Sequence, residues 1–184
     1  RKLPLAILAL LLEHGAVVNA QDADGETPLH LSESTSMIKM LLDKGRANPN
    51  IPNVDGICAL HLAVQRRDAD TVQALLRHNA RVDTADHVRW MNPLHLIVLP
   101  ARVKLEVNGV WLRIANMLCT QFGQHKPDLD FQDREGNTPL HYAVQLETGE
   151  AFSLTRIFLE KGADPNMKNE RNQSPLHLLC HNQE

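Results

Sequence analysis

The chain has 184 residues, a hydrophobic fraction of 43% and a formal net charge of −3 at pH 7. This length suits one domain or an elongated array, and the slightly negative charge gives no general attraction to nucleic acid. The sequence has no phosphate-binding loop, dinucleotide fingerprint, zinc-protease motif or nucleophile elbow, so we expect no catalytic site, no cofactor and no metal in this chain. Its three cysteines, Cys58, Cys119 and Cys180, lie far apart. They predict reduced thiols in an intracellular protein, either cytoplasmic or nuclear.

The first predicted element covers residues 3–12, which are almost wholly apolar. Its leucines follow a helical stripe at positions 5, 8, 11 and 12. Ten residues are too few to cross a bilayer, which needs roughly 20, so we expect no membrane insertion. We predict the buried second helix of a helix pair whose first helix is missing. Since the chain has no initiator Met, we expect it to be an excerpt from a longer protein.

One short motif recurs along the chain and ends in a histidine each time. The histidines are separated by 31, 34, 46 and 36 residues, and they are His30, His61, His95, His141 and His177. In Thr138-Pro139 the hydroxyl can cap a helix and Pro suits the first helical position, so the motif predicts a helix start. Recurrence at such intervals is typical of stacked repeat proteins.

The stretch Thr138-Pro139-Leu140-His141-Tyr142-Ala143 resembles the ankyrin repeat signature, and residues 12–19 and 159–166 resemble its tail. The next motif His follows 11 residues after the last tail position in four repeats and 12 after Asp83. The resemblance covers essentially the whole chain. It implies a mainly α fold with β-hairpin fingers, an ankyrin-repeat solenoid of stacked helix-turn-helix units. It also assigns the motif histidines a structural role, in which they join the finger loops to the helix starts.

We divide this single array, residues 1–184, by the positions of the motif and the tail. The expected units are a half repeat 1–19, repeats of about 20–50, 51–83, 84–130 and 131–166, and a half repeat 167–184. Apolar stripes predict the second helices of these repeats, for example Val72, Leu75 and Leu76 in one and residues 111–120 in the next. In the repeat 51–83, Cys58-Ala59 replaces Thr-Pro, so that helix start should lose its side-chain cap.

The repeat 84–130 departs most from the family pattern. Its finger, residues 86–91, has one extra residue and lacks the turn glycine, and residues 100–109 are an insertion. Val103, Leu105 and Val107 alternate with polar residues in this insertion. The alternation fits a short strand, and the alternative is an irregular loop that folds its apolar residues onto the array.

The middle of the chain is basic, since residues 66–104 hold seven Lys or Arg against four Asp. A docking patch for an acidic partner segment and ordinary solvated charge are both compatible with this. Trp and Arg dominate binding energies at interfaces, so we expect the finger-tip residues Arg89, Trp90 and Met91 to bind a partner. The alternative for Trp90 is packing against the insertion. The resemblance to ankyrin repeats implies that the neighbouring positions on the concave face are Asp55, Ile57, Gln65, Arg66 and Arg134.

The resemblance implies a non-catalytic protein-protein interaction module, a monomeric array that binds a protein partner with its finger tips and concave helix face. One alternative is the targeting or regulatory ankyrin domain of a larger enzyme or channel. Another is an array that binds a small ligand or nucleic acid through its basic middle. Asn166, preceded by Asp164-Pro165, resembles the family's site of asparagine hydroxylation, and Asn19 is a looser match. The alternative for both is a turn-forming asparagine.

Overall fold

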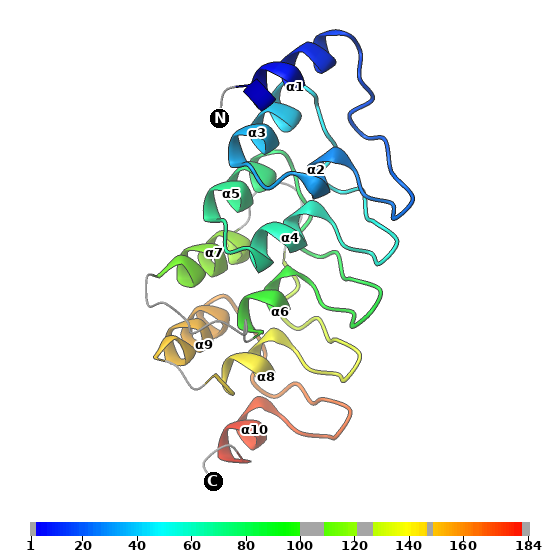
Figure 1. The fold of residues 1–184 in the computed structure, drawn as a ribbon. Helices are drawn as coiled ribbons and strands as arrows, with labels where there is room; N and C mark the ends of the chain where they lie inside the picture. The colour runs from blue at the N-terminus through cyan, green and yellow to red at the C-terminus, as the bar shows by residue number, and fades with distance from the viewer. Residues whose placement is uncertain (1–2, 100–108, 121–126, 147–148, 182–184) are drawn as a thin grey trace.

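The structure, a computed structural model, describes residues 3–99, 109–120, 127–146 and 149–181. Within these ranges it contains ten helices and no strand. The helices are stacked in one direction, and the first and last of them lie at opposite ends of an elongated molecule (Figure 1). This is the stacked arrangement that the recurring motif predicts.

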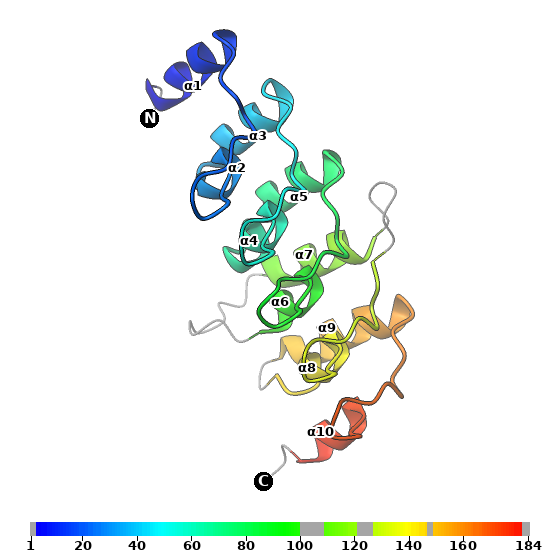
Figure 2. The same ribbon diagram turned by 90° about the vertical axis from the view of Figure 1, so that its right-hand side faces the viewer.

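The helices form two layers. The inner layer, next to the projecting loops, contains α2 (Pro28–Leu31), α4 (Ala59–Gln65), α6 (Pro93–Val98), α8 (Pro139–Ala143) and α10 (Pro175–His181). The outer layer contains α1 (Leu3–Glu13), α3 (Thr35–Asp43), α5 (Ala69–Arg77), α7 (Val110–Cys119) and α9 (Glu150–Glu160). Each helix packs against a neighbour in its own layer and, in most repeats, against its partner in the other layer (Figure 2).

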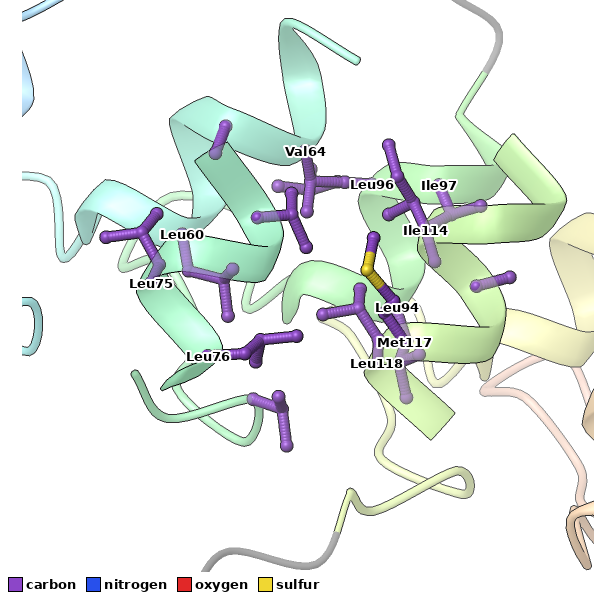
Figure 3. Packing of buried hydrophobic residues seen from close by; sticks show 14 of the residues in the cluster. Leu60, Val64, Leu75, Leu76, Leu94, Leu96, Ile97, Ile114, Met117 and Leu118 are labelled. Atoms are coloured by element: carbon purple, nitrogen blue, oxygen red, sulfur yellow. The ribbon is translucent and has the colours of Figure 1, made fainter. Parts of the chain in front are cut away.

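The apolar core lies between the two layers (Figure 3). The leucine before each motif histidine is buried in four repeats, at positions 29, 60, 94 and 140. The second helices contribute the residues that their stripes predict, including Val72, Ile114 and Leu118, each with none of its surface exposed. Since these side chains are covered by the next repeat as well as by their own, each repeat depends on its neighbours for a core.

The first helix is an exception to this burial. None of the residues of α1 is buried, and Ile7, Leu10 and Leu11 are about half exposed. The predicted helix is therefore present, but the prediction that it is buried is wrong. The helix is exposed because it lies at the end of the stack, where it packs against α3 on one side.

The loops that project from the inner layer are five short fingers, numbered here in chain order: residues 22–26, 53–57, 86–91, 133–137 and 169–173. In each finger a backbone hydrogen bond joins the first residue to the last, such as that from the N–H of Asn53 to the carbonyl of Ile57 at 2.9 Å. Neighbouring fingers are joined by one more, such as that from Arg134 to the carbonyl of Arg89 at 3.0 Å. The predicted hairpins are thus tight turns joined in a ladder, with no regular strand in the described ranges.

The motif histidine joins its own helix start to the next finger. The Nδ1 atom of His141 accepts the backbone N–H of Thr138 at 3.1 Å, and its Nε2 lies 3.0 Å from the carbonyl oxygen of Gln173 in finger 5. Because a carbonyl only accepts, Nε2 carries the proton, and because Nδ1 accepts an N–H, the ring is neutral. His30 and His95 make the equivalent bonds, while His61 donates to Thr84 instead. These bonds confirm the structural role predicted for the motif histidines.

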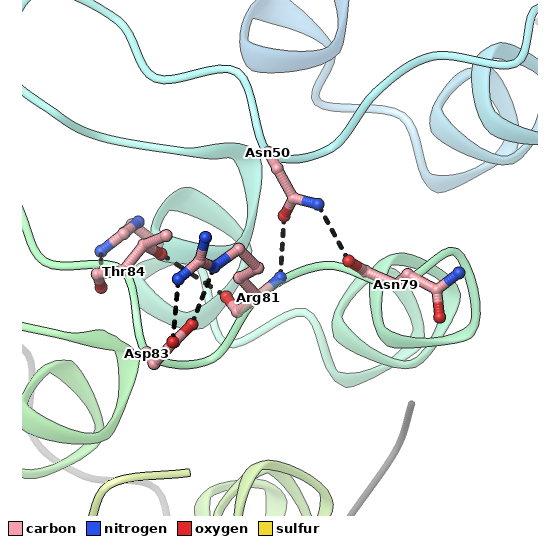
Figure 4. Close-up of polar contacts among 6 residues, drawn as sticks. Asn50, Asn79, Arg81, Asp83 and Thr84 are labelled. Carbon is pink, nitrogen blue, oxygen red and sulfur yellow. Dashed lines mark hydrogen bonds and ion pairs between the residues drawn. The ribbon is translucent and has the colours of Figure 1, made fainter. Parts of the chain in front are cut away.

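The repeat tails are joined in a similar way (Figure 4). The side chain of Asn50 accepts the N–H of Arg81 at 2.8 Å and donates to the carbonyl of Asn79 at 2.9 Å. Asn79 has a φ of 61°, the left-handed conformation that glycine adopts at other helix ends. The tails therefore hold consecutive repeats in register on the side of the second helices.

The two alternatives for the insertion concern residues 100–108, which lie outside the described residues. The structure resumes at Gly109, whose φ of 66° directly precedes α7. The predicted helix 111–120 is present as α7, with Trp111 buried at its first turn.

Candidate functional site

The fingers and the inner helices enclose three hollows in succession. The first lies between fingers 2 and 3 and has a volume of about 180 Å³. The second, between fingers 3 and 4, has about 440 Å³, and the third, between fingers 4 and 5, has about 460 Å³. Arg89 and Leu99 line both the first and the second, while Glu135 and Tyr142 line both the second and the third. The three hollows therefore form one continuous surface, here called the concave groove.

The wall of the groove at α8 is held together by hydrogen bonds. The Tyr142 hydroxyl donates to Oδ2 of Asp133 at 2.6 Å, and Oδ1 of Asp133 accepts the N–H groups of Glu135 and Asn137, each at 2.9 Å. Burial raises the pKa of the Tyr142 phenol well above its usual range. The buried Asp133 carboxylate is thus satisfied by donors of its own finger and of α8.

Finger 3 holds its tip in an unusual conformation. Trp90 has a φ of 58°, where fingers 1, 2 and 4 have glycines with φ between 74° and 76°. The left-handed region costs a residue with a Cβ about 1–2 kcal/mol, and 55% of Trp90 is nevertheless exposed. Strain of this kind persists where the surroundings impose it, and it clusters at binding sites. Asp86 imposes it here, because its carboxylate accepts the N–H groups of Val88, Arg89 and Met91.

The structure brings some of the predicted partner-binding residues together. Ile57, Gln65 and Arg89 line the first hollow, and Arg134 joins Arg89 in the second. Trp90 lies exposed on the same finger as Arg89. Four of these residues therefore line adjoining hollows at the level of fingers 2 to 4, while Trp90 lines none of the three hollows.

Of the other predicted residues, Met91 also lines the first and second hollows, but it is only 4% exposed and belongs to the core. The remaining two lie elsewhere. Arg66 lies at the end of α4, where it donates to the carbonyl of Ser32 at 3.0 Å and lines a separate crevice between α2 and α4. The side chain of Asp55 is exposed and lines none of the three hollows, while its carbonyl accepts the N–H of His87. The predicted continuous patch therefore does not include Asp55 and Arg66.

Several residues that line the groove are not among those predicted from the sequence. The position directly after the motif histidine lines the groove in three repeats, as Leu96, Tyr142 and Leu178. The motif itself carries the signal for this position, because it fixes the phase of the inner helix. Val88 and Glu135 have no such signal, since the direction of a finger side chain depends on the loop conformation.

The basic middle of the chain does not form one surface. The guanidinium of Arg67 lies 4.5 Å from the centre of the Trp111 ring, and Arg81 forms an ion pair with Asp83 at 3.0 Å. Of the arginines in the described part of residues 66–104, only Arg89 lines the concave groove. The structure therefore opposes a docking patch made of the whole basic segment.

The described residues contain no group of three or more His, Cys, Asp or Glu that could hold a metal ion. In the same part of the chain, no helix is long and apolar enough to cross a membrane. All three cysteines are free, and burial raises the pKa of the Cys119 thiol to about 12. That thiol is therefore protonated at neutral pH and a poor nucleophile.

Comparison with known proteins gives consistent matches along the chain. Models of ankyrin repeats match residues 3–98 (3 copies) and residues 124–179 (many copies). NF-kappa-B inhibitor zeta of Bos taurus is 28% identical over 205 residues, covering 92% of this chain and 27% of the relative. B-cell lymphoma 3 protein of Homo sapiens is 32% identical over 178 residues, covering 93% of this chain and 36% of the relative. The chain thus spans 27% to 36% of the length of these two relatives.

A solved structure is similar over almost the whole chain. It is the crystal structure of the ankyrin repeat domain of Bcl-3, described as a unique member of the IkappaB protein family. The two structures have a TM-score of 0.75 and 28% sequence identity, over 96% of this chain and 73% of that chain. The similarity confirms the predicted solenoid, and the relatives confirm the predicted class of protein-interaction module.

Proposed function

Since this chain belongs to the ankyrin repeat family, we propose that it binds a protein partner through the concave groove and the exposed tip of finger 3. The observation that carries this proposal is Trp90, an exposed tryptophan held at positive φ where three other fingers have glycine. A large apolar side chain in a strained and solvated position has no role in the core. It is suited to be an anchor at an interface.

The partner that the relatives favour is NF-kappa-B. One relative is named as an inhibitor of NF-kappa-B, and the similar solved domain is described as a member of the IkappaB family. We infer that this array binds an NF-kappa-B protein as a monomer, without catalysing a reaction. We also infer that it does so inside the cell, in the cytoplasm or the nucleus, which agrees with three free cysteines.

The test is a binding titration of the purified array against immobilised NF-kappa-B dimers. We expect Trp90→Ala to weaken binding at least tenfold, because truncation of an interface anchor costs about 2 kcal/mol or more. Arg77→Glu is the matched control, because Arg77 is exposed at the end of α5 and lines none of the three hollows. Equal affinities for these two variants would place the binding surface elsewhere, and no binding by the unmodified array would reject NF-kappa-B as the partner.

A further inference from the structure

The first two hollows of the groove differ in chemistry. The walls of the first are largely apolar, with Ile57, Val88, Leu96 and Leu99 around it. Val88 is 55% exposed at the tip region of finger 3, so this apolar wall reaches the solvent. A surface of this kind accepts an apolar side chain, because burial against it removes apolar area from water on both sides.

The second hollow carries two arginines from neighbouring fingers, Arg89 and Arg134. Neither forms an ion pair with a carboxylate among the described residues. Arg134 donates through Nη2 to the carbonyl of His87 at 2.6 Å, which holds that side chain in place across the two fingers. Arg89 has no side-chain hydrogen bond in the described part of the molecule.

Two carboxylates also line this hollow. Asp133 is 6% exposed and already accepts the Tyr142 hydroxyl and two backbone N–H groups, so its charge is directed inward. Glu135 is exposed, and its Oε2 accepts the side-chain amide of Asn137 at 3.3 Å. The two guanidinium groups therefore keep free donors for an acceptor supplied from outside.

The distance between the two hollows follows from the stacking of the repeats. Packed helices lie about 8–10 Å apart, and the fingers repeat with the helices that they precede. An extended segment in the polyproline II conformation advances about 3.1 Å per residue with three residues per turn, so side chains three residues apart lie on one face. A polyproline II segment that lies along the groove would thus place side chains about three residues apart into successive hollows.

Resting on the proposed function, we propose that the bound partner segment is extended and acidic. An apolar side chain occupies the hollow between fingers 2 and 3. A carboxylate about three residues away is held by Arg89 and Arg134, since planar guanidinium groups bind carboxylates with two parallel hydrogen bonds. The preference is local, because the chain as a whole has a net charge of −3 and does not attract acidic segments in general.

The test is selection of randomised peptides of about nine residues, long enough to cross three fingers in extended form, displayed on phage against the immobilised array. We expect enrichment of Asp or Glu about three residues from an enriched apolar residue. In Arg89→Glu the acidic preference should disappear, and in Arg89→Glu/Arg134→Glu it should reverse to Lys or Arg. In Val88→Asp the apolar preference should be lost while the acidic preference stays. Arg77→Glu is again the control and should select the same peptides as the unmodified array.

Melting temperatures of all variants show whether each one is folded. Arg89→Glu is the decisive variant, because the Arg89 side chain is exposed and makes no hydrogen bond or ion pair among the described residues. Peptides without an acidic preference, an unchanged preference in Arg89→Glu, or no enriched peptide at all would overturn the inference. The proposed function is judged separately, because loss of NF-kappa-B binding in Trp90→Ala does not depend on which peptides are selected.

Discussion

The Nε2 atom of His95 lies 3.0 Å from the carbonyl oxygen of Asn137, a residue of the following repeat. His95 is fully buried, and its Nδ1 accepts the backbone N–H of Asn92 at the start of its own helix. One side chain thus satisfies a helix start and a finger of the next repeat at the same time. This relationship recurs at His30 and His141, so it is a regular polar connection between consecutive repeats, beside the bonds between fingers and between tails.

His95→Ala should strongly destabilise the array. Each buried group that it leaves unpaired costs about 1–3 kcal/mol, so the free energy of unfolding should fall by roughly 2–5 kcal/mol. His177→Ala is the matched control at the last motif, where the ring is exposed and its Nε2 has no partner in the described part of the chain. We expect a change within about 0.5 kcal/mol there. Urea unfolding measures both, and a similar loss for the two variants would contradict the prediction.

Stability should fall as the pH drops below 6.5. Burial is the main cause that lowers the pKa of His61, His95 and His141 from the usual 6.5. Between the lowered value and 6.5 the unfolded chain binds more protons than the folded one, so acid favours unfolding. Protonation would also place a donor at Nδ1, opposite a backbone N–H. Urea unfolding at about pH 7.5 and pH 5.5 tests this, and equal stability at both would mean that the histidines keep ordinary pKa values when folded.

Trp90→Gly should separate stability from binding. Glycine adopts positive φ without strain, so the free energy of unfolding should rise by up to about 1 kcal/mol while partner binding weakens. Gly56→Ala, at the equivalent position of finger 2, should instead lower the free energy of unfolding. A Cβ there would meet the His87 ring at 2.5 Å, and Gly56 has a φ of 76°. If Trp90→Gly lowers the melting temperature instead, Trp90 has a packing role.

Leu140→Ala and Leu176→Ala change the same motif position in different surroundings. Leu140 is 2% exposed between neighbouring repeats, and its truncation should cost roughly 2–5 kcal/mol. Leu176 is 65% exposed on α10, so its truncation should cost less than about 0.5 kcal/mol. Thermal unfolding of the two variants gives the comparison. A large effect of Leu176→Ala would show that α10 is covered in solution.

Asn166 should be hydroxylated in preference to Asn19 if the array is a substrate of an asparaginyl hydroxylase. Asn166 is exposed, and its side chain makes no hydrogen bond among the described residues. Asn19 is held, because its Oδ1 accepts the N–H of Asn48 at 2.9 Å. Peptide mass spectrometry after enzyme treatment should locate a gain of one oxygen, about 16 Da, at Asn166. An unmodified Asn166 would leave the turn-forming role as its only role.

Much of the fold could be predicted from the sequence because its signals are local. A capping side chain, a proline and a leucine in a row define where an inner helix begins, whatever the neighbouring repeat contains. The spacing between motifs then defines how many repeats are stacked. The cap loss predicted at Cys58 does not set that helix apart, because Thr27 and Thr138 also make no side-chain capping bond, whereas Asn92 does.

The composition of the groove, in contrast, was decided by the tertiary structure. Met91 and Trp90 are adjacent in the sequence, yet one is 4% and the other 55% exposed. The difference arises from a positive φ at Trp90, which Asp86 stabilises through three backbone N–H groups. Arg66 and Arg89 are both in the basic middle, but they lie on different surfaces because one ends a helix and the other belongs to a finger. The sequence by itself determined the repeats, since each helix start is a local event. Only the stacking decided which side chains share the groove, since they come from different repeats and point where their loops and neighbours direct them.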